Sequence, residues 1–189
     1  MIRKIKQRLF AIAFVALALT LLTQETLAYY TTVGTATNVV TSGEISLKIK
    51  EMTDQGTEFP TDGVYIMPGD VVSKIVTVEN ICSHPFYLRV KLVYGIDSKE
   101  LTAEDCIKLN INTENWVYKD GWYYYTGIVQ PGQETPQVFS HVEIVGSQVD
   151  TSYIGKTLQL SVIAQAVQSE NNPIQNGDTT TAAGWPAEK

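Results

Sequence analysis

The sequence is poor in the residues from which most enzyme active sites are built. Its 189 residues include only two cysteines and two histidines, and they form no HExxH, CxxC or CxxH pattern. A GxSxG nucleophile elbow and a glycine-rich phosphate loop are missing as well. These absences argue against most hydrolases and phosphate-binding enzymes. We therefore expect a protein that is not an enzyme and needs no metal or other cofactor.

Basic residues are scarce beyond the first eight positions. Four of the fourteen lysines and arginines lie there, at Arg3, Lys4, Lys6 and Arg8, and a chain cut after Ala28 keeps 10 basic against 19 acidic residues, a net charge of −9. A surface of that sign repels phosphate backbones. We therefore expect no nucleic-acid partner.

The first 28 residues have the layout of a secretory signal peptide. A basic start leads into an apolar run from Leu9 to Leu22, which is 14 residues long where a membrane-spanning helix needs about 20. A polar step then ends at the small residue Ala28. We expect cleavage between Ala28 and Tyr29 and a secreted protein; the alternative is an uncleaved membrane anchor.

No sustained helical periodicity follows the leader, and the chain instead alternates apolar and polar residues between turn signals. This pattern predicts an all-β fold, an antiparallel sandwich over residues 44–168 with short helical turns in its loops, one of them within 98–105. Spacing alone does not separate a sandwich from a barrel. The expected strands lie at 45–50, 71–80, 86–94, 107–111, 116–118, 122–125, 138–145 and 158–166.

Two segments flank this predicted domain. Residues 29–43 are β-prone but offer little more than Val33, Val39 and Val40 to bury, so they form a strand only if a sheet accepts them. Residues 169–189 turn to Ser, Asn, Pro, Thr and Ala with a lone Trp185. We predict a flexible, solvated tail there.

The cysteines and histidines leave alternatives open. An oxidising exterior permits a disulfide between Cys82 and Cys106, and two half-buried thiols are the alternative. His84 is predicted to be a polar loop residue and His141 a sheet-surface residue. They would bind a metal only if the fold brought both together with an acid.

The aromatic residues between Trp116 and Tyr125 predict a hairpin that turns at Lys119-Asp120-Gly121. Its side chains are expected to pack in the core and against one another across the strands. A stacking platform for sugars or nucleobases is the alternative.

The chain resembles the TasA/camelysin family of Gram-positive bacteria over roughly residues 1–168. The likeness rests on several short motifs in a specific order. They are Ala28-Tyr29-Tyr30, Thr35-Ala36-Thr37-Asn38, Gly43-Glu44-Ile45-Ser46-Leu47, Met67-Pro68-Gly69-Asp70, Val76-Thr77-Val78-Glu79-Asn80, Tyr87-Leu88-Arg89-Val90, Trp122-Tyr123-Tyr124-Tyr125, Pro131-Gly132, Phe139 and Ala164-Gln165-Ala166-Val167-Gln168.

The resemblance implies a jelly-roll sandwich, export with cleavage by a dedicated signal peptidase, and a place in the extracellular biofilm matrix or at the cell surface. It also implies polymerisation by donor-strand exchange, with the chain itself or a related matrix protein as the partner. The donor would be the segment 29–43, with Tyr30, Val33, Val39 and Val40 as its docking residues. Strand addition of this kind uses backbone hydrogen bonds along a sheet edge.

Two other functions stay open as alternatives. Some family members are metallopeptidases, although this sequence has no HExxH motif and two histidines in all. A monomeric cell-surface binding module that uses the aromatic hairpin is the second. The chain departs from the family pattern in Cys82, in Cys106 and in the tail around Trp185.

Overall fold

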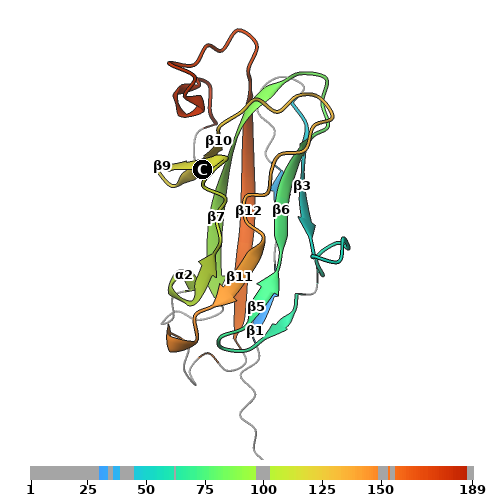
Figure 1. Cartoon of the computed structure of the whole chain (residues 1–189), viewed down its shortest axis with the longest axis vertical. Helices are drawn as coiled ribbons and strands as arrows, with labels where there is room; N and C mark the ends of the chain where they lie inside the picture. The colour runs from blue at the N-terminus through green and yellow to red at the C-terminus, as the bar shows by residue number, and fades with distance from the viewer. Residues whose placement is uncertain are drawn as a thin grey trace, which may run out of the picture.

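The computed structural model describes residues 30–33, 36–38, 45–61, 63–96, 103–148, 153 and 156–186. Strands dominate it (Figure 1), which confirms the all-β prediction. The strands are β1 (Tyr30–Val33), β2 (Ala36–Asn38), β3 (Leu47–Met52), β4 (Tyr65–Ile66), β5 (Val71–Ser73), β6 (Ile75–Asn80), β7 (Phe86–Ile96), β8 (Ile107–Leu109), β9 (Trp116–Lys119), β10 (Trp122–Tyr125), β11 (His141–Ile144) and β12 (Thr157–Gln168). The short helices are α2 (Ala103–Cys106), η1 (Gly146–Gln148) and η3 (Thr179–Thr181).

The larger sheet is built around the two longest strands, β7 and β12, which run side by side along the molecule (Figure 1). They pair antiparallel from Leu158 opposite Ile96 to Gln168 opposite Phe86. The sheet continues from β7 to β10 and β9, and from β12 to β1 and β4, while β2 also pairs with β12. β12 is therefore an interior strand with a neighbour on each edge.

The second layer consists of β3 with β6, and of β5 with β11 and β8. The segment before β11 joins these two groups, because it runs beside β6 and exchanges backbone hydrogen bonds with it. Val76 N donates to Phe139 O at 3.1 Å, and Val138 N donates to Val76 O at 2.7 Å. β5 and β6, which Lys74 separates, therefore run on as one long strand beside β11 and the segment before it.

The core lies between the layers. Alternate residues of β12, Leu158, Leu160 and Val162, are fully buried and belong to one cluster with Val76 and Val78 of β6. Burying each such side chain stabilises the fold by about 1.5–3 kcal/mol. The period-two patterns of the sequence match this arrangement, because every second side chain of a strand faces the same layer.

Two turns form where the local chemistry favours them. Gly69 has φ +91° and Asp70 N donates to Met67 O, which closes a turn over Met67–Asp70. Asp120 and Gly121 both have positive φ values, 50° and 83°, as a two-residue turn between β9 and β10 needs. The predicted hairpin is confirmed.

Part of the predicted flexible, solvated tail is packed in this structure, which describes residues 169–186 of it. This part, which we call the C-terminal segment, returns to the outer face of the larger sheet, and its Ala182 packs with Tyr87 and Val167 in a second apolar cluster. The outer face of β7 is therefore covered at Tyr87 and Arg89, while Val93 farther along the same face is exposed. Tyr87 is 5% exposed and Arg89 8% exposed.

Candidate functional site

Where the structure describes it, the N-terminal arm (residues 29–43) lies along the edge of β12 that does not pair with β7. β1 pairs in parallel with Thr157–Gln159, and β2 pairs in parallel with Val162–Ala164. Thr31 faces Thr157 and Ala36 faces Val162, so the separation is 126 residues in both ladders. The two short strands therefore keep one register and act as a single added strand.

The arm also contacts the rest of the sandwich. On the side away from β12, Tyr30 and Thr31 of β1 pair with Ile66 and Tyr65 of β4. β2 lies close to β3 of the second layer. The arm therefore pairs with one edge of β12 and also lies next to the second layer, while β7 pairs with the other edge of β12.

The predicted docking residues fall partly on this ladder. Tyr30 and Val33 are the first and last residues of β1, whereas Val39, Val40, and the cleavage residues Ala28 and Tyr29 lie outside the described residues. Sequence reasoning expected the arm to pair with a neighbouring copy. In this structure, which holds one chain, it pairs with the sheet of its own chain.

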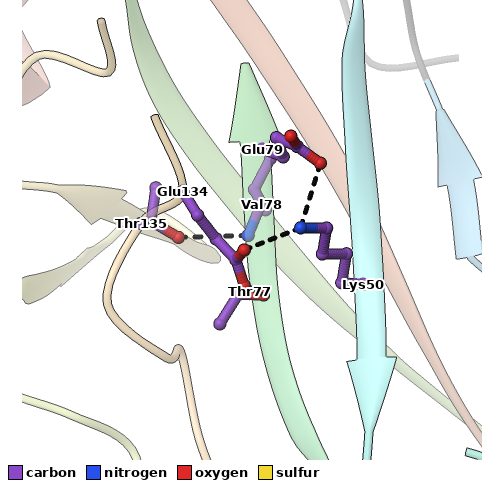
Figure 2. A network of polar contacts seen from close by, with 6 residues as sticks. All are labelled: Lys50, Thr77, Val78, Glu79, Glu134 and Thr135. Atoms are coloured by element: carbon purple, nitrogen blue, oxygen red, sulfur yellow. Dashed lines mark hydrogen bonds and ion pairs between the residues drawn. The ribbon is translucent and has the colours of Figure 1, made fainter. Parts of the chain in front are cut away.

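A polar network fastens the second layer on its outer surface (Figure 2). Lys50 Nζ of β3 lies 3.0 Å from Glu79 Oε2 and 2.7 Å from Glu134 Oε2. The Thr77 hydroxyl donates to Glu134, and Val78 N donates to Thr135 Oγ1 at 3.1 Å. The hydrogen bond to Glu134 and then that to Glu79 raise the pKa of Lys50, and the bonds from Lys50 and Thr77 lower the pKa of Glu134. The network ties β3 and β6 to the segment that contains Glu134 and Thr135, which is a structural task.

Arg89 of β7 holds the C-terminal segment. Its guanidinium lies between two indole rings, 4.1 Å from the centre of Trp122 and 4.7 Å from that of Trp185. Nε and Nη2 donate to Gln165 Oε1 at 3.0 and 2.6 Å, and Nη1 donates to the Tyr124 hydroxyl at 3.1 Å. The cation is thereby buried with its donors satisfied, and a guanidinium stacks well on aromatic faces.

Further contacts seat the rest of this segment. Nη2 of Arg89 also donates to Pro186 O at 3.3 Å. Thr179 Oγ1 donates to the backbone oxygen of Tyr125 at 2.8 Å, and Asp178 caps η3 by accepting from Thr180 N at 2.9 Å. The hydrogen bonds from Thr180 lower the pKa of Asp178.

The aromatic hairpin is used for packing, as predicted. Trp116 and Tyr125 pack across the strands with ring centres 5.4 Å apart, and Tyr118 and Tyr123 do so at 5.0 Å. Tyr118 is still 62% exposed. Trp116, Trp122 and Tyr124 are buried. The exposed aromatic platform that a stacking site requires is not formed by the described hairpin.

Both cysteines are free thiols in this structure, Cys82 half-buried and Cys106 buried. The Cys82 thiol lies in the turn after β6 and donates to Asn80 Oδ1 at 3.0 Å and to His84 O at 3.2 Å. Cys106 is buried at the end of α2.

The two histidines are at the kinds of place predicted. His84 Nδ1, in the loop between β6 and β7, lies 3.5 Å from Glu170 Oε2, and His141 Nδ1, on β11, lies 2.8 Å from Ser140 Oγ. Within the described ranges, no group of three or more His, Cys, Asp or Glu side chains is arranged to hold a metal ion.

Sequence reasoning missed the Arg89 site. The pattern places Arg89 on the strand face opposite the core, and a lone tryptophan in a polar stretch carries no positional signal. One clue was available: a large aromatic residue such as Trp185 rarely stays in water when apolar surface is within reach.

Comparisons with protein-family models, with curated proteins and with solved structures find no match to this chain. In the part of the chain that the structure describes, none of the helices is long and apolar enough to cross a membrane. The geometry of the arm and its edge therefore carries the functional argument.

Proposed function

We propose that the protein is a secreted structural component of an extracellular or biofilm matrix, with a jelly-roll type of sandwich, that assembles into fibres by exchanging its N-terminal arm after the leader is removed. Each copy places its arm on the β12 edge of a neighbour, in the register that the arm adopts within its own chain. A head-to-tail exchange that does not close on itself yields a filament.

The parallel ladder between the arm and β12 is the observation that supports this proposal. A ladder of backbone hydrogen bonds does not depend on which copy supplies the strand, provided the register is kept. The arm precedes the sandwich in the chain, and once the leader is removed it is joined to the rest of the protein at its C-terminal end only. An arm of this kind leaves its own sheet without breaking the β7–β12 pairing that organises the fold.

Removal of the leader is the step that permits the exchange. While residues 1–28 are attached, the end of the arm that must thread into a neighbour carries a bulky, apolar extension. Cleavage between Ala28 and Tyr29 leaves a donor that begins one residue before β1. Sequencing the amino terminus of secreted material tests this directly, and we expect it to begin at Tyr29.

The decisive experiment compares the mature chain with a variant that lacks residues 29–43, by electron microscopy and by sizing over a range of concentrations. We expect filaments from the mature chain and none from the shortened one. Filaments from both, or from neither, would contradict the proposal.

A competition experiment avoids the question of whether the shortened variant folds. A synthetic peptide of residues 29–43, added in excess to the assembling mature chain, should occupy the β12 edge and shorten the filaments. A peptide of the same composition in permuted order is the control, and we expect it to leave filament length unchanged.

A further inference from the structure

Lys74 is the most deeply buried charged side chain in the described part of the chain. It lies between β5 and β6, where its backbone N donates to Ser140 O at 3.0 Å. The side chain is 0% exposed, and Nζ lies 3.2 Å from Oε2 of Glu51, a residue of β3 that is itself 13% exposed. The ring of Phe59 covers the amine, with its centre 4.6 Å from Nζ.

The pairing is incomplete. Neither Lys74 Nζ nor Glu51 Oε1 has a hydrogen-bond partner among the described residues. Buried polar groups are nearly always satisfied, so an exception requires an explanation. Taking both charges out of water costs several kcal/mol per ion, and close contact repays this only when the remaining hydrogen bonds are also made.

Burial favours the neutral form of the amine. Desolvation lowers the pKa of Lys74, even though the neighbouring Glu51 carboxylate acts in the opposite direction. Transfer of one proton within the pair gives an uncharged amine beside a carboxylic acid. The amine nitrogen then has a lone pair, and the Glu51 carbonyl carbon is its adjacent electrophile.

We propose that Lys74 and Glu51 become joined by a side-chain amide bond. The nitrogen attacks Cδ of Glu51, the C–N bond forms, and one C–O bond breaks. The departing oxygen carries away two protons, the one that Lys74 gave to the carboxylate and a second one from the attacking nitrogen, and leaves as water, so that an amine and a carboxylic acid give an amide and one water with no oxidant or other reactant. Two groups held in contact by a rigid scaffold react with effective molarities of about 10⁵–10⁸ M.

The surrounding structure fixes both partners. Glu51 faces Val76 in the β3–β6 ladder, and its backbone oxygen accepts from Phe59 N at 2.8 Å. Lys74 stands two residues before Val76. The bond would close a covalent loop over residues 51–74, which contains β4, the strand that borders the arm. It would also replace two buried charges by a neutral group.

Tryptic digestion of the denatured, purified protein tests the proposal. The sequence places trypsin sites after Lys50, Lys74 and Arg89, with no other lysine or arginine between them. An acylated Lys74 is not cleaved, so we expect a peptide of residues 51–89 that is lighter by one water. Recovery of the linear peptide 51–74 at its full mass would overturn the proposal.

Two other reactions in this peptide also release water, but both leave Lys74 open to trypsin. They are cyclisation of Glu51 when it becomes a peptide amino terminus, and dehydration at Asp62-Gly63. The missed cleavage at Lys74 is therefore the discriminating signal.

Two variants serve as controls. Lys74→Arg retains the charge and the trypsin site and cannot form the amide under these conditions, so it should release peptide 51–74. Glu51→Ala should restore cleavage after Lys74. If the uncleaved peptide persisted at Lys74 in Glu51→Ala, the assignment of Glu51 as the partner would be wrong.

Discussion

The two ends of the chain return to the same sheet in different ways. The N-terminal arm lies on the edge of β12 and is held there by main-chain pairing with β12 on one side and β4 on the other. The C-terminal segment lies on the outer face of that sheet and is held by side chains, above all by Arg89 between Trp122 and Trp185.

This difference separates an exchangeable contact from a specific one. Main-chain pairing requires an extended strand in register and accepts many sequences. The Arg89 site requires two indole rings, an amide oxygen and a hydroxyl at fixed positions, so few substitutions preserve it. We therefore expect the arm to move between copies and the C-terminal segment to stay with its own chain.

The largest effect is expected from Arg89→Ala. It removes a buried cation together with its hydrogen bonds to Gln165 and Tyr124 and its contacts with both rings, and should lower the free energy of unfolding by about 3 kcal/mol. Urea unfolding of the mature chain measures this. Lys119→Ala, which removes one exposed hydrogen bond to Thr180, is the control and should change the free energy by less than about 0.5 kcal/mol. If the two substitutions lowered the free energy of unfolding equally, the Arg89 site would not be the specific contact that distinguishes the C-terminal segment from the arm.

An intermediate effect is expected from Thr31→Pro in the arm. Thr31 has a partner on each side, Thr157 and Tyr65, so proline removes a ladder hydrogen bond whichever way the N–H points. We expect the arm to open more easily by about 1.5 kcal/mol, measured as faster hydrogen exchange in β1 and β4, with the exchange of η3 unchanged. Thr31→Val keeps the N–H and should exchange like the parent chain. Equal loss of protection in η3 would show that the two ends are coupled.

The smallest effect is expected from acid. The hydrogen bonds from Thr180 lower the pKa of Asp178 below its ordinary 3.8 in the folded state, so the stability they supply is present above that value and is lost as the pH falls through the lowered one. The described arm strands and their partners on β12 contain no Asp, Glu or His. Below about pH 4, we expect hydrogen exchange to rise in 175–182 more than in the arm. In Asp178→Asn, the added hydrogen exchange of residues 175–182 at low pH should disappear.

The sequence is sufficient to predict most of the strands and turns. Alternation at 45–50 places Leu47 and Ile49 in the core and leaves Lys48 exposed, because a strand presents successive side chains to opposite faces. The turn at Asp120-Gly121 follows from residues that tolerate positive φ. These features depend on neighbours in the chain, so local pattern reveals them.

Features that join distant residues are not predictable in this way. Arg89 and Trp185 are 96 positions apart, and neither position differs locally from an exposed one. Lys74 stands between two strands, β5 and β6, and it is fully buried because Glu51 and Phe59 come from a different part of the chain. The parallel pairing of the arm is missed for a similar reason, since the sequence indicates a strand but not its partner.

The placement of the tryptophans gives the protein a built-in optical reporter. Of the three, Trp116 is in the core, while Trp122 and Trp185 both contact the Arg89 guanidinium. Undocking of the C-terminal segment carries a single half-buried indole, that of Trp185, into water and leaves the other two in place. Its fluorescence emission then shifts to longer wavelength, so the docking equilibrium can be followed in unlabelled protein.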